Sequence, residues 1–176
     1  DVWELINIAN CHPRINILQP GPGVGGHCIA VDPWFIVSKT PANANLIRIA
    51  RKVNDSKPDW VIDKVKIAIS DFLQANPSKR TEDVTIACYG LAFKPNIDDV
   101  RQSPALSIVL EIIAMHVGRV IAVDPNVQRS PDVKIKLTSI AEANTQGDIA
   151  VLLVDHKEFK GLKVSAKHTV DTKGIW

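Results

Sequence analysis

The chain has 176 residues, of which 45% are hydrophobic, and its 21 Lys and Arg residues nearly balance its 19 Asp and Glu residues. The net charge of +2 gives no indication of a nucleic-acid or anionic-membrane partner, and no apolar run approaches the roughly 18 residues that a membrane-spanning helix needs. Three widely spaced cysteines argue against a disulfide framework, so we expect a cytoplasmic protein in a reducing compartment.

The N-terminal part is predicted to be helical around a glycine-rich loop. Residues 1–11 carry apolar side chains at helical spacing without a leading methionine, which indicates the end of a helix within a longer chain. The segment from His12 to Pro33 is rich in Gly and Pro and is predicted to be a loop with short extended pieces. Residues 34–37 suit a brief strand.

The periodicity of the chain changes near its middle. A long helical pattern follows Pro41, and Pro58 is the point at which we expect it to kink or split. The polar residues 76–83 form the best domain boundary. Beyond them, strands are predicted at residues 84–90, 119–125, 148–155 and 168–172, and helices at 103–117, at 139–144 and from 156. This alternation predicts an α/β fold, with a helical segment (residues 1–80) followed by a Rossmann-like parallel-sheet domain (residues 81–176).

The stretch GPGVGGHCIAVDPW places three glycines in a G-x-G-x-x-G spacing that ends at Gly26. A dinucleotide fingerprint opens a helix, and the β-branched residues and proline after Gly26 do not resemble a helix start, so we interpret the match as accidental. Dense glycines also let backbone N–H groups approach a ligand closely and favour negative charge nearby. Cys28 is therefore a candidate nucleophile, and Asp32 a candidate to orient water or act as a base. A structural thiol is the alternative for Cys28.

A second candidate site follows the first strand of the α/β domain, because ligands bind beyond the carboxyl ends of such strands. Only Gly90 remains of a fingerprint there, and Lys94 and Arg101 stand before a predicted helix N-terminus. Two cations at that place can hold a phosphate; alternatively, this is a solvated loop in which Arg101 pairs with Asp99. Asp124 ends the next strand, where it could bind a ribose hydroxyl or hold a turn, and we favour the turn.

No metal site is expected. Two Cys–His pairs occur in the N-terminal part, but neither C-x-x-C nor H-x-x-x-H spacing supports zinc. These pairs are Cys11–His12 and His27–Cys28. Cys88 lies inside a buried strand pattern and is expected in the core. The remaining histidines are expected at the surface or at strand ends rather than as ligands. They are His116, His156 and His168.

Three stretches taken together, GPGVGGHCIAVDPW, FKPNIDDVRQSP and LIRIARKVND, resemble the UDP-glucose/GDP-mannose dehydrogenase family over essentially the whole chain. The resemblance is greatest to bacterial members that act on UDP-N-acetylhexosamines, UDP-N-acetyl-D-mannosamine in particular, and supply precursors of polysaccharides such as enterobacterial common antigen. Family members have an NAD-binding Rossmann domain, a central helical dimerisation region and a nucleotide-sugar domain. The resemblance therefore implies that this chain lacks the NAD domain, is inactive alone and forms a homodimer through its central helix.

The family oxidises the C6 alcohol of a nucleotide-sugar to a carboxylate with two NAD⁺ in succession. Cys28 matches the cysteine that holds the substrate as a thiohemiacetal and then as a thioester, and Asp32 matches the acid that positions water or a proton. Arg101 matches an arginine on the cofactor side. Arg14 matches an arginine that crosses the dimer interface. The full set of residues implied to contact the UDP-sugar is Arg14, Gln19, Pro20, Gly21, Pro22, Gly23, Val24, Gly25, Phe93 and Lys94.

Two alternatives stay open. The chain could be a standalone nucleotide-binding and dimerisation module without catalysis, although such a module would not need Cys28 and Asp32. It could also be a 6-dehydrogenase for UDP-N-acetylglucosamine or UDP-N-acetylgalactosamine. His27 and Val31 stand where UDP-glucose members have serine and lysine, which suits an acetylated sugar but does not fix the epimer.

Overall fold

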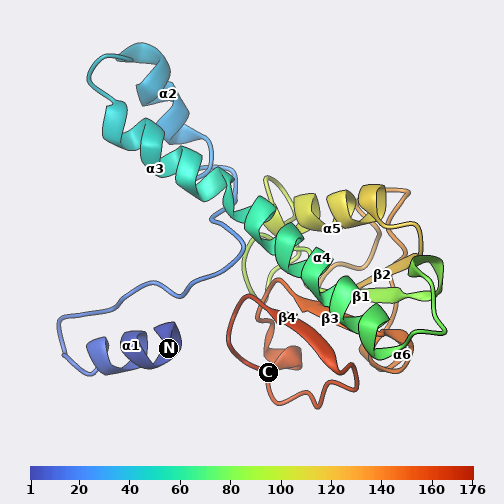
Figure 1. The fold of residues 1–176 in the computed structure, drawn as a ribbon. Coiled ribbons are helices and arrows are strands. Elements are labelled where there is room, and N and C mark those ends of the chain that lie inside the picture. Colours follow the sequence, from blue (N-terminus) through green and yellow to red (C-terminus); the bar gives the residue numbers. More distant parts are fainter.

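A parallel four-stranded sheet forms the centre of the C-terminal half in the computed structural model, which describes residues 1–176 (Figure 1). The strand order is β2-β1-β3-β4. The strands are β1 (Thr85–Tyr89), β2 (Arg119–Val123), β3 (Ile149–Leu152) and β4 (His168–Asp171). All three pairings are parallel, so the carboxyl ends of the strands meet at one edge. The predicted strands and the predicted α/β class are confirmed.

Helices cover both faces of this sheet. The connections between the strands are α5 (Pro104–Met115), α6 (Ile140–Gln146) and the 3₁₀ turn η2 (Lys157–Phe159). The side chain of Ser103 caps α5 by accepting a hydrogen bond from the amide of Leu106. Pro104 occupies the first turn, where a missing N–H costs nothing. This cap fixes where the segment after β1 turns into α5, the helix predicted at residues 103–117.

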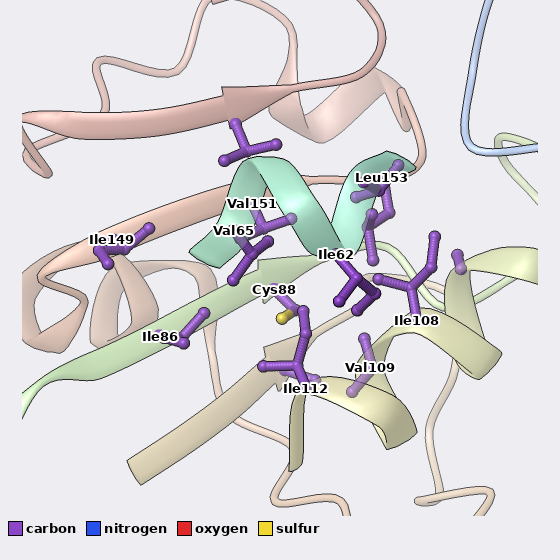
Figure 2. Close-up of a cluster of buried hydrophobic side chains, with 14 of the residues drawn as sticks. Ile62, Val65, Ile86, Cys88, Ile108, Val109, Ile112, Ile149, Val151 and Leu153 are labelled. Atoms are coloured by element: carbon purple, nitrogen blue, oxygen red, sulfur yellow. The ribbon is translucent and has the colours of Figure 1, made fainter. Parts of the chain in front are cut away.

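Alternate residues of each strand enter two different cores. Ile86 and Cys88 of β1 face the larger core, together with α4 (Lys57–Ala75) and α5, whereas Ala87 and Tyr89 face the smaller one with α6. Figure 2 shows Cys88 among the aliphatic side chains of the larger core. Its side chain is buried, as predicted, and burial raises the pKa of the Cys88 thiol to about 12.

A helical arm precedes the sheet. It consists of α1 (Val2–Ala9), α2 (Asp32–Lys39) and α3 (Asn45–Asp55), with α2 and α3 forming a hairpin that projects from the α/β body (Figure 1). The helices α3 and α4 are separated at Ser56, just before Pro58, so the predicted split is confirmed. None of the helices combines the length and apolarity that crossing a membrane requires.

The predicted strand at residues 34–37 is wrong, because these residues lie within α2. Pro33 falls in the first helical turn, where proline is well tolerated, and burial of Val37 on one helix face outweighs the weak β preference of Ile36 and Val37. The domain boundary between residues 80 and 81 stays a prediction. On its N-terminal side, α4 supplies five side chains to the larger core, namely Val61, Ile62, Val65, Ala68 and Phe72.

Candidate active site

The glycine-rich loop packs directly on the turn that precedes α5. The amide of Gly26 donates to the carbonyl oxygen of Gln102 at 3.3 Å. A Cβ on Gly25 would overlap that same oxygen and lie 2.6 Å from Cδ of Pro104, so a side chain is excluded there. Gly26 has a φ of 93°, and a Cβ on it would lie 3.0 to 3.2 Å from the ring of Phe93. The loop and the segment after β1 therefore form one packed unit.

The glycine-rich loop is not a dinucleotide fingerprint, as predicted, but the reason differs from the one given by the sequence. A helix does follow the glycines, since α2 begins at Asp32. However, no strand precedes them, because residues 15–20 adopt no regular structure, and a fingerprint turn needs that strand.

A pocket of about 450 Å³ lies between the glycine-rich loop and the segment after β1. It contains every residue that the resemblance placed on the substrate except Arg14. These are Gln19, Pro20, Gly21, Pro22, Gly23, Val24, Gly25, Phe93 and Lys94. Two stretches that are distant in the sequence thus share one cavity, while their part in binding stays a prediction. Arg14 lies on the exposed segment between α1 and this loop, outside the pocket.

Three lysines and one aspartate give the pocket a net positive charge. Lys57, Lys94 and Lys173 line it together with Asp155. The ammonium of Lys173 lies 3.2 Å from a carboxylate oxygen of Asp155 and donates to the carbonyl oxygen of Pro20 at 3.1 Å. Two of the three cations remain without a carboxylate partner, so the pocket suits an anionic ligand such as a diphosphate.

Lys57, Lys173 and Asn54 were not predicted. Lys173 follows the carboxyl end of β4, so the same strand-end rule that indicated Lys94 could have found it. Asn54 lies near the end of α3, within the stretch LIRIARKVND that contributes to the resemblance, but no role was predicted for it. Its side chain accepts a hydrogen bond from the amide of Val24 at 2.7 Å and donates to the carbonyl oxygen of Val24 at 3.2 Å. Asn54 thus fixes the glycine-rich loop against the helical arm.

Cys28 lies in an exposed turn that leads into α2. Its carbonyl oxygen accepts from the amides of Val31 and Asp32 at 2.9 and 2.8 Å, which places Asp32 one turn further along the chain at the start of α2. Cys28 itself does not line the pocket, whereas the next residue, Ile29, does. The thiol is accessible to solvent, as a nucleophile must be, but its role stays a prediction.

Arg101 forms the ion pair that was one of its two predicted interpretations. Its Nε and one terminal nitrogen contact both carboxylate oxygens of Asp99 at 2.7 to 3.0 Å. The hydrogen bonds and charge of Arg101 lower the pKa of Asp99 to about 2. The same terminal nitrogen lies 3.5 Å from Nδ1 of His27, the residue before Cys28. The segment after β1 thereby brings a cation to the cysteine loop.

Asp124 holds a turn, as predicted. One carboxylate oxygen accepts from the amides of Asn126 and Val127 at 2.9 and 3.2 Å. The other accepts from the amides of Leu91 and Ala92 at 2.7 and 3.1 Å. These bonds leave the carboxylate buried beneath the segment after β1 rather than facing the pocket.

Neither His116 nor His156 lies at the surface, one of the two places expected for them. Both side chains are buried. Nε2 of His116 lies 2.8 Å from the carbonyl oxygen of Val84, and His156 lies among the loops at the carboxyl edge of the sheet, where it contacts Asp124. Each imidazole can be buried because one of its ring nitrogens has a hydrogen-bond partner. His168, at the start of β4, is at a strand end as expected.

Two family models match the chain. Residues 1–56 match the central domain of the UDP-glucose/GDP-mannose dehydrogenase family, and residues 87–176 match the UDP-binding domain of the same family. The second match alone covers half of the chain and contains the sheet, apart from the first two residues of β1, with its carboxyl-edge loops. The first contains the cysteine loop and the projecting helical hairpin.

Similar proteins carry related names. The chain is 56% identical to the UDP-N-acetyl-D-mannosamine dehydrogenase of Salmonella typhi, covering 100% of this chain and 43% of that protein. It is 49% identical to the NDP-N-acetyl-D-galactosaminuronic acid dehydrogenase of Ralstonia nicotianae, covering 100% of this chain and 41% of that protein. A solved UDP-D-ManNAc dehydrogenase from Pyrococcus horikoshii superimposes with a TM-score of 0.80 at 36% identity, covering 99% of this chain and 41% of that one. This chain thus spans less than half the length of these relatives.

The two family matches, the shared fold and the high identities agree with one another. The chain belongs to the UDP-glucose/GDP-mannose dehydrogenase family.

Proposed function

We propose that this chain is the substrate-binding, nucleophile-bearing part of an NAD-dependent UDP-N-acetyl-D-mannosamine 6-dehydrogenase. The observation that carries the proposal is the basic pocket enclosed by the glycine-rich loop and the segment after β1, with the cysteine turn directly beside it. The UDP-N-acetyl-D-mannosamine dehydrogenases at 55–56% identity support the choice of sugar.

The pocket has the chemistry that a UDP-sugar needs. Its volume of about 450 Å³ lies within the range of small-molecule sites. Pro104 and Ala105, in the first turn of α5, line it, so the positive end of that helix adds to the charges of Lys57 and Lys94 around a diphosphate. Lys94 extends from the loop that packs on the glycines, where it can contact both the diphosphate and the sugar.

Cys28 would carry the substrate between the two oxidations. Its thiolate adds to C6 of the aldehyde, forming the sulfur–carbon bond of a thiohemiacetal whose oxygen takes up a proton. Loss of a hydride and a proton leaves a thioester. Water then attacks C6, the sulfur–carbon bond breaks, and the carboxylate and the thiol are released. Asp32, one turn beyond Cys28, would orient that water or accept its proton.

NAD⁺, when bound, accepts the hydride removed from C6 in each oxidation. Arg101 is the residue of this chain that could contact it. Asp99 holds the Nε and one terminal nitrogen, so the second terminal nitrogen is free, and the side chain is 66% exposed. An anchored guanidinium with a free, solvent-facing edge fits a phosphate presented by a separate cofactor domain.

A homodimer through the central helix is part of the same proposal. Leu46, Ile49 and Val53 form an apolar stripe along α3 at helical spacing, and their exposed fractions are 82%, 58% and 60%. A helix of an ordinary monomer would bury such a stripe. A second copy of the chain packing stripe against stripe would cover it symmetrically. Arg14, on its exposed segment, would then be available to the partner's pocket.

The proposed function is tested by a substrate panel. An enzyme in which this chain follows an NAD-binding domain is given UDP-N-acetylmannosamine, UDP-N-acetylglucosamine, UDP-N-acetylgalactosamine and UDP-glucose, and NADH formation is followed. We expect the highest kcat/KM with the first sugar, no uronate from Cys28→Ser, and a larger loss of UDP-sugar affinity than of NAD⁺ affinity from Lys94→Ala. The 176-residue chain alone should form no NADH.

Three other outcomes would contradict parts of the proposal. A preference for the galacto epimer would assign the activity that the name of the Ralstonia relative suggests. Undiminished uronate formation by Cys28→Ser would refute the nucleophile. Tight UDP-sugar binding with no oxidation of any sugar in the panel would favour the binding module.

A further inference from the structure

Three loops at the carboxyl edge of the sheet converge on the imidazole of His156, which is fully buried. Nδ1 lies 2.9 Å from the backbone amide of Asn96, in the loop after β1, and 2.9 Å from the side-chain amide nitrogen of Asn126, in the loop after β2. Nε2 lies 3.1 Å from a carboxylate oxygen of Asp124. His156 itself follows β3. The imidazole of His156 therefore links the loops that follow β1, β2 and β3.

The backbone amide of Asn96 decides which ring nitrogen carries the proton. A backbone N–H is always a donor, so Nδ1 must accept and the proton must reside on Nε2, from which it points at Asp124. Burial alone would raise the pKa of Asp124, but the hydrogen bonds from His156 and from the amides of Leu91 and Asn126 hold it below its ordinary value. The pair is thus a neutral imidazole donating to a carboxylate.

The same contacts fix the segment that carries Lys94. Asn96 adopts a left-handed backbone with a φ of 62°, and its side-chain oxygen accepts from the amide of Lys157 at 3.0 Å. At the other end of the segment, Asp124 holds the amides of Leu91 and Ala92. Phe93 and Lys94 lie between these two anchors.

Phe93 connects the segment after β1 to the cysteine loop. Its ring packs against Gly26 of the cysteine loop, where an added Cβ would lie as close as 3.0 Å. A shift of the segment after β1 would therefore reach both Lys94 in the pocket and the loop that carries Cys28. No part of His156 lines the pocket, so it could act only through these neighbours.

We propose that His156 is a positioning residue. By accepting a hydrogen bond from the backbone amide of Asn96, it holds Lys94 and Phe93 in the positions that UDP-sugar binding requires. This proposal rests on the proposed function, because it assigns a step to the same pocket. Packing alone would make the ring replaceable by any buried group of similar size. Positioning requires an acceptor at Nδ1 in particular.

Two variants separate these roles. In His156→Gln the amide can reach the position of Nε2 and donate to Asp124, but it leaves Asn96 without its acceptor. In His156→Asn the amide oxygen can take the place of Nδ1, but Asp124 loses its donor. We expect His156→Gln to bind UDP-N-acetylmannosamine about tenfold more weakly than His156→Asn, as befits one lost buried hydrogen bond. We expect both variants to melt at lower temperature than the parent chain.

The measurements are isothermal titration calorimetry of the 176-residue chain with UDP-N-acetylmannosamine and with UDP, and long-range ¹H–¹⁵N NMR of the imidazoles. The NMR spectrum should show a protonated Nε2 and a bare Nδ1 on His156, and the Asn96 amide should exchange faster in His156→Gln than in His156→Asn. Equal affinities in the two folded variants, or a proton on Nδ1, would overturn the proposal.

A control separates this proposal from the proposed function. If the parent chain binds neither ligand, the proposed function fails, while amide exchange still tests the link to Asn96. If the chain binds and Lys94→Ala weakens binding but His156→Gln does not, only the positioning role fails. Should His156→Gln not fold, the NMR of the parent chain still tests the link. A proton on Nδ1 of His156, or an Asn96 amide that exchanges as fast as an exposed one, would overturn the proposal.

Discussion

Replacement of Gly25 by alanine tests whether the pocket depends on the contact between the glycine-rich loop and the turn before α5. The new Cβ would overlap the carbonyl oxygen of Gln102 and lie 2.6 Å from Pro104 and 3.1 Å from Cβ of Phe93. Because two of these groups belong to the backbone or to a proline ring, no change of rotamer relieves the clash. The loop must therefore move away from the turn by about an ångström.

The cost of that movement follows from the bonds that hold the loop. The hydrogen bond from Gly26 to Gln102, at 3.3 Å, would be lost, and the two bonds between Val24 and Asn54 would be stretched. At about 1 kcal/mol for each bond, the displaced loop loses about 1–3 kcal/mol. Since 1.4 kcal/mol corresponds to a factor of ten, UDP-sugar affinity should fall between about fivefold and about 150-fold.

Calorimetric titration with UDP-N-acetylmannosamine measures this loss, and differential scanning calorimetry shows whether the fold survives. The melting temperature should fall by a few degrees, because the folded state loses the loop bonds, but the fold should survive, because none of the groups that the new Cβ meets belongs to the larger core. Gly21→Ala, in the same loop, meets only the flexible end of Lys173 and should lose less affinity. Parent-like affinity in Gly25→Ala would refute the idea that this contact shapes the pocket.

Three further predictions concern other parts of the molecule. Iodoacetamide at pH 8 should modify the exposed Cys11 and Cys28 but leave Cys88 unmodified in the native chain, because burial raises its pKa to about 12; peptide mass spectrometry identifies the sites. The pKa of Asp99 is lowered to about 2, so its ion pair should persist at every pH above the ordinary carboxyl range and be lost only as the pH falls through about 2. A ¹³C NMR titration with a midpoint near 4 would contradict this. If the parent chain sediments as the proposed dimer, Ile49→Asp should convert it into monomers in sedimentation velocity, and an unchanged sedimentation coefficient would show that α3 is not the interface.

The α/β half of the chain follows closely from its sequence because its signals are local. Apolar runs such as residues 84–90 bury both faces of a parallel strand, and Ser103 followed by Pro104 marks a helix start. These patterns depend on near neighbours, so they survive in the structure. By contrast, the preference of residues 34–37 for a strand was overridden, because Val37 is buried by helical packing that no local pattern reveals.

Residues of the candidate site could be predicted where they directly follow a strand. They could not be predicted where their role depends on contacts between distant segments. Lys94 was indicated by its position after a strand, and the same rule would have indicated Lys173. Asn54 and His156 act through partners that lie 30 or more positions away in the chain, so their spacing carries no signal. His156 was misjudged for this reason, since a lone histidine gives no sign that three separate loops will enclose it.

The bond between Lys173 and Pro20 spans 153 positions of the chain, and this separation has a consequence for the order of folding. Contacts between distant segments require large loops to close, so they are expected to form late. The sheet and its helices can assemble first, with the pocket wall joining last, and the wall should be the first region to detach in mild denaturant. The wall of the pocket would then unfold and refold locally while the core beneath it stays folded.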